Sequence, residues 1–166
     1  GNLGSYLLGN VNKITHSKAD TSLSGYKAFL MSELPVHGAT GYKCYVDESA
    51  WMGNLWMGRL LEFFVELFAQ IHSGQETKQG VDVAYKQTLS SHHNYFQRSL
   101  FSAGTRALPA RGGLLEALRG SDHADVRDVL EDIGEFVAVG RVVAKFCLQV
   151  NEELDRCLQQ ERQRRG

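Results

Sequence analysis

The chain has 166 residues, of which 43% are hydrophobic and 22% charged, a balance typical of one globular domain with a sizeable core. Its formal net charge of −1 offers no basic field to nucleic acid, and three cysteines are too few for a disulfide framework. No apolar run is long enough to span a membrane, because Glu62 and Glu66 interrupt the longest one.

Helical periodicity dominates the chain, so we expect an all-α fold in a single domain over residues 1–166. In chain order, helices are predicted over residues 7–15, 21–34, 49–71, 81–108, 113–119 and from 122 to at least 154. The pattern over 49–71 is the strongest, since apolar residues recur there every three or four positions, which indicates a central helix. Pro109 is expected to end the fourth helix, and Asp122 to cap the start of the last.

Two polar residues, Asn10 and Lys13, are three apart, so a helix places both side chains on one face. An amide and an ammonium group in that arrangement can hydrogen-bond sugar hydroxyls or a phosphate. The alternative is an ordinary solvated helix face, which is the commoner reason for exposed polar residues.

Three further side chains lie on apolar stripes of predicted helices. Trp56 is either a core residue or a ring on which a ligand stacks. Arg59 lies one turn further along the same helix, where it must extend to solvent, pair with an acid or face a polar opening. His93 stands between Leu89 and Phe96, as a hydrogen-bonded core residue or as a donor to a ligand carbonyl.

Catalytic chemistry has little support in this sequence. A helical hydrolase using His93 is the enzymatic alternative, but the polar group formed by Asp82, Ser90, Ser91, His92 and His93 lacks a recognisable nucleophile motif. We therefore predict no catalytic residue and no enzyme activity. Adjacent histidines on a helix diverge, and no suitably spaced Glu or Cys accompanies them, so we predict neither a metal site nor a cofactor.

Three motifs occur in a recognisable order. They are Gly9-Asn10 with Lys13, then the stretch 55–59 (Leu-Trp-Met-Gly-Arg), then Ala84-Tyr85 with His93, followed by residues 106–109 (Arg-Ala-Leu-Pro). In this order and spacing they resemble the headgroup site of the glycolipid transfer protein family, and the resemblance covers nearly the whole chain.

The resemblance implies a two-layer helical sandwich that holds one sphingolipid. Asn10 and Lys13 would hold the headgroup sugar, Trp56 would stack on it with Arg59 nearby, and His93 would bond the ceramide amide carbonyl. The acyl and sphingoid chains would enter an apolar pocket lined by Phe63, Phe64, Phe68, Leu89, Phe96, Leu100 and Val143. Tyr95, with Arg98 beside it, would contact the membrane.

Two departures from the family pattern bear on function. Tyr6 stands where the family has the aspartate that accepts the ceramide amide N–H, and a buried amide without its acceptor costs about 1–3 kcal/mol, so we expect weakened or altered binding. Relatives also have a helix before this motif, which here begins almost at Gly1. We therefore expect a fragment, a short isoform or a minimal form, and exposed apolar surface that favours a homodimer or a protein partner.

These observations predict a cytoplasmic carrier, peripheral at membranes, that binds a glycosphingolipid and moves it between bilayers. A neutral, hydroxyl-rich headgroup is favoured because relatives that carry phosphorylated ceramide resemble this chain in fold but use Lys and Arg where Asn10 and Trp56 stand. Transfer of phosphorylated ceramide, or a lipid sensor or interaction module with an altered site, remain the alternatives.

Overall fold

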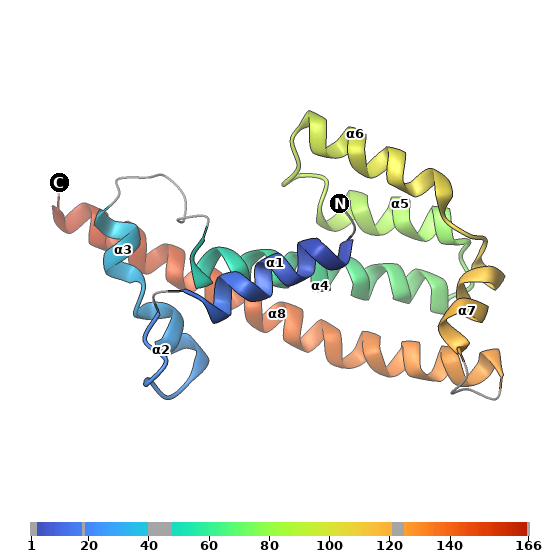
Figure 1. The fold of residues 1–166 in the computed structure, drawn as a ribbon, viewed down its shortest axis with the longest axis horizontal. Coiled ribbons are helices and arrows are strands. Elements are labelled where there is room, and N and C mark those ends of the chain that lie inside the picture. The colour runs from blue at the N-terminus through green and yellow to red at the C-terminus, as the bar shows by residue number, and fades with distance from the viewer. Residues whose placement is uncertain (1–2, 18, 40–47, 121–124, 166) are drawn as a thin grey trace. The chain divides into compact units, whose positions relative to one another are not determined.

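The computed structural model describes residues 3–17, 19–39, 48–120 and 125–165 (Figure 1). In chain order the helices are α1 (Leu3–Thr15), α2 (Tyr26–Met31), α3 (Leu34–Ala39), α4 (Ala50–His72), α5 (Thr77–Thr88), α6 (Tyr95–Gly104), a 3₁₀ turn η1 (Thr105–Ala107), α7 (Arg111–Arg119) and α8 (Val126–Arg165). These ranges contain no strand, and the predicted all-α class is confirmed. No helix within them combines the length and apolarity that crossing a bilayer requires.

Helix α4 begins and ends within one residue of the prediction for 49–71. Its start is defined locally, because the Ser49 hydroxyl oxygen accepts a hydrogen bond from the Met52 amide at 3.1 Å. The regular spacing of its apolar residues gives the remainder of the helix one continuous packing face.

The prediction of one helix over 81–108 is wrong, because the chain leaves the helix between α5 and α6. Asn94 caps α6: its side chain accepts from the Gln97 amide, and the Gln97 side chain accepts from the Asn94 amide, both at 2.9 Å. This reciprocal pair satisfies N–H groups that a continuing helix would have bonded to its own carbonyls, so it stabilises a helix start at this point. His93 therefore lies in the connection and not on a helical stripe.

The predicted helix over 21–34 is also shorter than expected. Asp20 Oδ1 accepts from the Ser22 amide at 2.9 Å, which stabilises a turn, and Gly25 has a positive φ of 93° just before α2. A separate helix, α3, follows with Pro35 in its first turn, where a missing N–H costs least.

The last helix begins at Val126. Asp125 Oδ1 accepts from the Arg127 amide at 2.6 Å and the Asp128 amide at 3.3 Å, so Asp125 has the capping role. The predicted cap, Asp122, lies outside the described residues.

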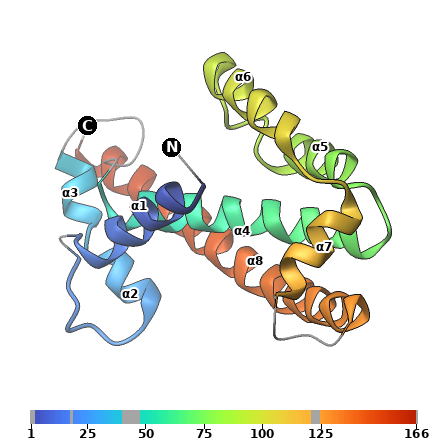
Figure 2. The same cartoon turned by 45° about the vertical axis from the view of Figure 1, so that its right-hand side comes forward.

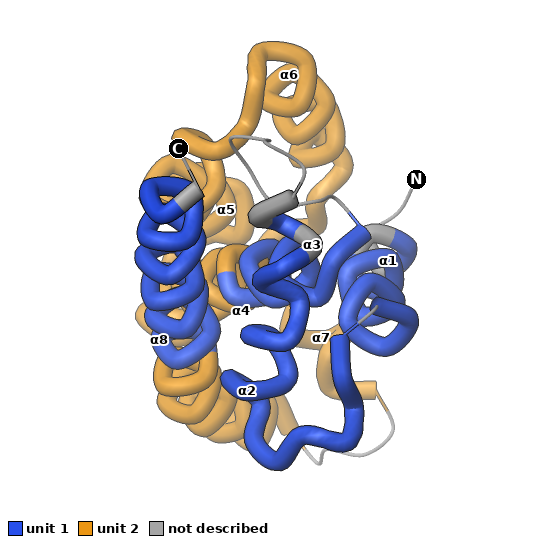
Figure 3. The backbone as a smooth tube through the Cα atoms, turned by 90° about the vertical axis from the view of Figure 1, so that its left-hand side faces the viewer, with its two compact units in different colours: residues 1–58, 144–166 blue, residues 59–143 orange. Residues whose placement is uncertain are grey.

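The chain divides into two compact units (Figure 3). Unit 1 comprises residues 1–58 and 144–166, and unit 2 comprises residues 59–143. Helices α4 and α8 contribute a part to each unit. The single domain over 1–166 stays a prediction.

The core of unit 1 centres on Trp51, whose side chain is fully buried. Its indole N–H donates to the Leu30 carbonyl oxygen, and its ring stacks on His37 with centroids 4.4 Å apart. These contacts attach α2 and α3 to the first half of α4. The core also contains Ala19, Ala50, Val150, Leu154 and Leu158.

In unit 2, the second half of α4 packs against the first half of α8. A Cβ added to Gly140 would lie 2.7 Å from Val65 Cγ2, so only glycine permits this approach. Further along the pair, Phe68 and Phe136 meet edge to face, with centroids 5.4 Å apart. Helix α5 lies beside the second half of α4, and α6 lies next to α5 in both views of the ribbon (Figures 1 and 2).

Candidate functional site

In unit 1, helix α1 lies directly against α4 at Gly53. A Cβ on Gly53 would lie 2.8 Å from the Asn10 carbonyl oxygen, 2.9 Å from Ile14 Cγ1 and 3.2 Å from Lys13 Cβ. Since real Cβ atoms do not approach so closely, this helix crossing depends on the absence of a side chain at position 53. Residues 10–14 of α1 are thereby held against the first half of α4.

This crossing brings three of the predicted headgroup residues into one region of unit 1. Trp56 lies three positions after Gly53, one turn along the face that α1 contacts. Asn10 is only 3% exposed, and Lys13 and Trp56 are half-buried. Burial of Asn10 excludes a solvated face for that residue, and the role of Trp56 as a stacking ring stays a prediction.

Tyr6 belongs to α1, four residues before Asn10, so helical spacing places both on one face. Its side chain lies outside the described residues. The weakened or altered binding expected from tyrosine in place of the family's aspartate therefore stays a prediction.

A second polar group in unit 1 was not foreseen from sequence. Asn54 is fully buried; it accepts from the Tyr26 hydroxyl at 2.9 Å and donates to the Cys147 carbonyl at 3.0 Å and to the Asn151 side chain. Asn151 in turn donates to the Trp51 carbonyl at 3.2 Å. These bonds join α2, α4 and α8 through satisfied buried groups, so their role is structural.

Burial raises the pKa of one member of this network, Tyr26. Desolvation, with a smaller contribution from Cys147, raises the pKa of Tyr26 to about 12. The phenol therefore keeps its proton and acts as a donor to Asn54 throughout the physiological range.

Unit 2 contains the other two predicted headgroup residues, Arg59 and His93. Both are half-buried. Desolvation lowers the pKa of His92 and of His93, and the positive charge of Arg59 adds a smaller effect in the same direction. Their predicted combination with Asn10, Lys13 and Trp56 of unit 1 in one headgroup site stays a prediction.

His93 is held by specific contacts. Its Nδ1 lies 3.1 Å from the Tyr85 hydroxyl, and its carbonyl oxygen accepts from Arg98 Nε at 2.9 Å. The Tyr85 ring stacks on Phe101 with centroids 3.8 Å apart and an interplanar angle of 11°. Position 85 belongs to the motif, but the sequence did not predict its contact with His93, because the contact depends on a break after α5 that was not predicted.

The pKa of His93 is lowered mainly by desolvation, with smaller effects of His92, Arg98 and Arg59. Burial likewise raises the pKa of Tyr85. Each shift favours the neutral form, so a neutral imidazole faces a neutral phenol at pH 7.

The two predicted membrane-contact residues, Tyr95 and Arg98, lie in the first turn of helix α6. The Tyr95 side chain is 86% exposed, and Arg98 is exposed as well. Phe96 and Leu100, one turn apart, are 68% and 58% exposed. Both are predicted to line the chain pocket, and that role stays a prediction; in this structure they form part of an apolar surface of α6.

The other predicted pocket residues are distributed along unit 2. Phe63 and Leu89 are buried, Phe64 and Phe68 are half-buried, and Val143 is 44% exposed. Phe63 meets Phe64 edge to face at 5.4 Å, and Phe64 stacks with Phe68 at 6.4 Å. The three phenylalanines of α4 thus form one continuous row of rings.

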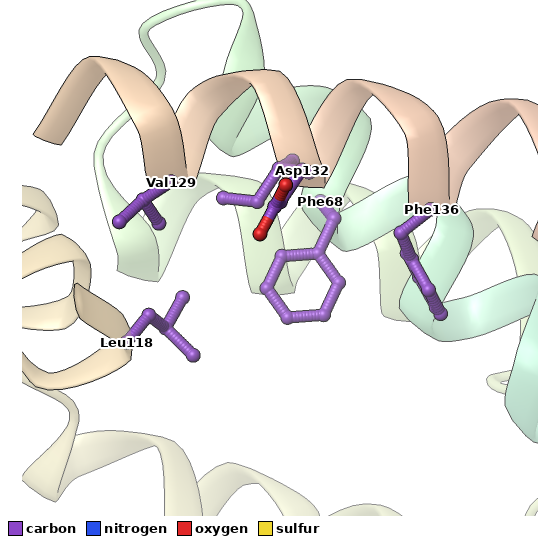
Figure 4. Close-up of a pocket in the computed structure, with 6 residues that line it drawn as sticks. Phe68, Leu118, Val129, Asp132 and Phe136 are labelled. Carbon is purple, nitrogen blue, oxygen red and sulfur yellow. The ribbon is translucent and has the colours of Figure 1, made fainter. Parts of the chain in front are cut away.

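An apolar pocket of about 210 Å³ opens at the end of this row (Figure 4). Of the predicted pocket residues only Phe68 lines it; the other lining residues are Leu118, Val129, Asp132, Ile133 and Phe136. These other residues come from α7 and α8, and sequence spacing does not reveal that these helices lie beside α4. The volume is below the ~300–1,000 Å³ typical of ligand sites, so in this state it holds at most part of one hydrocarbon chain.

Comparison with known proteins identifies relatives over the region that contains the three motifs. The sequence profile of the family described as Glycolipid transfer protein (GLTP) matches residues 5–120. A glycolipid transfer protein from Aureobasidium melanogenum is 35% identical over 80 residues, which are 47% of this chain and 39% of that protein. The pleckstrin homology domain-containing family A member 8 of Danio rerio is 29% identical over 113 residues, 67% of this chain and 20% of that protein.

Among solved structures, the crystal structure of mouse ceramide-1-phosphate transfer protein in its apo form superimposes with a TM-score of 0.74 at 17% identity. The match covers 91% of this chain and 74% of that one, and it confirms the predicted fold. The chain spans less than half the length of the curated relatives that it matches. The profile match extends through all three motifs, and the chain therefore belongs to the glycolipid transfer protein family.

Proposed function

We propose that this chain binds one sphingolipid and carries it between membranes, with a glycolipid as the preferred cargo. The observation that carries the proposal is the crossing of α1 over α4 at Gly53, which seats Asn10 and Lys13 beside the face that bears Trp56. An amide, an ammonium group and an indole in one region match the chemistry of a sugar, which offers hydroxyl groups and an apolar C–H face.

In this proposal the residues of unit 2 recognise the ceramide. His93 donates from its neutral ring to the amide carbonyl, and Arg59 contributes to the headgroup contacts. Tyr6 meets the amide N–H with a phenol oxygen, a weaker acceptor than the carboxylate of relatives. No covalent change in the lipid is expected.

The hydrocarbon chains would enter the apolar interior of unit 2 alongside Phe63, Phe64 and Phe68. The pocket of about 210 Å³ among the described residues holds only part of one chain, so uptake through this pocket would require the helices that line it to separate. Burying each methylene stabilises the complex by about 0.8 kcal/mol, which favours the lipid-filled state.

Docking to the membrane is assigned to α6. Tyr95, Phe96 and Leu100 expose a mixed aromatic and aliphatic surface next to Arg98, a combination suited to shallow contact with a bilayer interface. Reversible contact of this kind lets the carrier leave after it has exchanged its cargo.

Phosphorylated ceramide is the second candidate cargo, and one observation favours it. Burial is the main cause of the lowered pKa of His93, and the positive charges of Arg98 and Arg59 add smaller effects in the same direction. Two guanidinium groups near one imidazole would also attract a phosphate.

The direct test measures transfer of fluorescent galactosylceramide and of ceramide-1-phosphate between vesicles. Trp56→Ala should reduce galactosylceramide transfer at least about tenfold, because it removes the stacking ring, and Trp56→Phe should restore part of it. If the purified chain transfers neither lipid while remaining folded, the carrier proposal is wrong; faster transfer of the phosphorylated lipid would select the second candidate.

The mapping of Tyr6 has its own test. Tyr6→Asp restores a carboxylate acceptor for the ceramide amide, so affinity for the sphingolipid should rise roughly ten- to a hundredfold. An unchanged binding isotherm would contradict the placement of this residue in the site.

Membrane contact is tested with vesicles that contain no sphingolipid. Tyr95→Ala should bind such vesicles more weakly than wild type, whereas Ser102→Ala, an exposed substitution on the same helix, should bind like wild type. Equal partitioning of all three proteins would remove α6 from the docking model.

A further inference from the structure

The contact between Tyr85 and His93 bears on which ring nitrogen of His93 carries the proton and can donate a hydrogen bond. The Tyr85 hydroxyl lies 3.1 Å from Nδ1, which is hydrogen-bonding distance, and the two rings are tilted by 50° with centroids 5.5 Å apart. A neutral imidazole has one N–H and one bare nitrogen, so a donor at Nδ1 favours the proton on Nε2, whereas an acceptor at Nδ1 favours it on Nδ1.

Chemistry gives this hydrogen bond a direction. A phenol O–H is a stronger donor than an imidazole N–H, and an imidazole nitrogen is a stronger acceptor than a phenol oxygen. The favoured arrangement therefore has Tyr85 donating and Nδ1 accepting, with the ring proton on Nε2.

We infer that Tyr85 is a positioning residue: its hydroxyl fixes His93 in the Nε2–H tautomer and so determines the donor that His93 presents to a ligand carbonyl. The inference rests on the proposed function for the identity of the ligand, but the tautomer itself is a property of the ligand-free protein.

The surroundings hold both rings in place. Tyr85 stacks on Phe101, which meets Phe63 of α4 edge to face at 5.8 Å. Arg98 Nε holds the His93 carbonyl, and the next residue, Asn94, caps α6. His93 is thus held at its backbone carbonyl by Arg98 and at ring Nδ1 by Tyr85.

The charged and titratable groups around His93 favour the same state. Arg59, Arg98 and His92 all disfavour a second proton on the ring, and burial keeps Tyr85 protonated. A neutral acceptor nitrogen therefore faces an intact hydroxyl donor over the physiological range.

The test is long-range ¹H–¹⁵N NMR of histidine-labelled, ligand-free protein near neutral pH. Wild-type His93 should show a bare Nδ1 and a protonated Nε2. Tyr85→Phe keeps the stacked ring but removes the hydroxyl, so the His93 signals should move toward a mixture of tautomers and the pKa of His93 should rise. Tyr26→Phe, which removes a hydroxyl in unit 1, should leave the His93 signals unchanged.

Two results would overturn the inference. One is a wild-type His93 that carries its proton on Nδ1; the other is an Nε2–H tautomer that persists unchanged in Tyr85→Phe. Neither result requires that the protein bind a lipid, so each is distinct from a failure of the proposed function.

The binding readout then links the tautomer to the ligand. If the chain binds galactosylceramide, Tyr85→Phe should weaken binding roughly three- to tenfold, the effect of one hydrogen bond. His93→Gln and the double variant should bind alike, because Tyr85 acts only through His93; additive losses in the double variant would contradict that role.

Discussion

Replacing Gly53 with alanine tests the contact on which the headgroup region depends. The new Cβ would meet the Asn10 carbonyl oxygen at 2.8 Å and Ile14 Cγ1 at 2.9 Å. A carbonyl within a helix cannot rotate away from its neighbour, so α1 must shift as a body. Forced overpacking of this kind costs about 1–3 kcal/mol, whereas alanine in a helix gains about 0.5–1 kcal/mol over glycine.

The expected net loss is therefore at most about 2.5 kcal/mol in the free energy of unfolding, or up to roughly 10 °C in Tm, and it is about 1–3 kcal/mol relative to an alanine placed without a clash. The chain has two tryptophans, Trp51 and Trp56, and both belong to unit 1. Urea titration followed by tryptophan fluorescence thus reports on the affected unit. Binding of galactosylceramide should fall as well, since the shift moves Asn10 and Lys13 away from Trp56.

Gly9→Ala is the matched control on the same helix. Among the described residues, no atom outside the neighbouring residues and the backbone of α1 lies within 4 Å of a Cβ built at Gly9, so this variant should gain about 0.5–1 kcal/mol from helix propensity alone. If Gly53→Ala is as stable as Gly9→Ala and binds lipid equally well, the argument from the helix crossing is refuted.

Three other substitutions or conditions have defined outcomes. Asn54→Ala should lower the free energy of unfolding by about 2–4 kcal/mol, because it leaves several buried partners unbonded, as urea titration would show. Asn94→Ala should cost about 0.5–2 kcal/mol and accelerate hydrogen exchange at the start of α6. Stability should fall as the pH drops below about 6.5: the lowered pKa values of His92 and His93 mean that the unfolded chain takes up protons before the folded one does.

Each of these has a result that would contradict it. Asn12→Ala removes an exposed amide from α1, so a loss equal to that of Asn54→Ala would mean that burial is not the cause. Unchanged exchange in Asn94→Ala would exclude the capping role. For the histidines, Tm measured from about pH 7.5 to about pH 5 should decline less in His93→Gln than in wild type, and equal slopes would exclude His93 as a contributor.

Local signals in the sequence determined the helices where they were consistent. The apolar repeat over 49–71 predicted α4 within one residue at each end, because every turn repeats the same face. The break before α6 was equally local, since Asn94 and Gln97 have the spacing of a capping box, but the apolar repeat that continues past it concealed the signal. Motif order alone identified the family that the profile match confirms.

Tertiary structure alone decided which of these residues meet. Asn54 and Asn151 bond across 97 positions, and no periodicity within either helix indicates its partner. Tyr85 reaches His93 only because the chain turns between α5 and α6. Helix formation depends on neighbours within about four residues, whereas the register between two helices depends on complementary faces. At the crossing of α1 and α4, that register depends on the missing Cβ of Gly53.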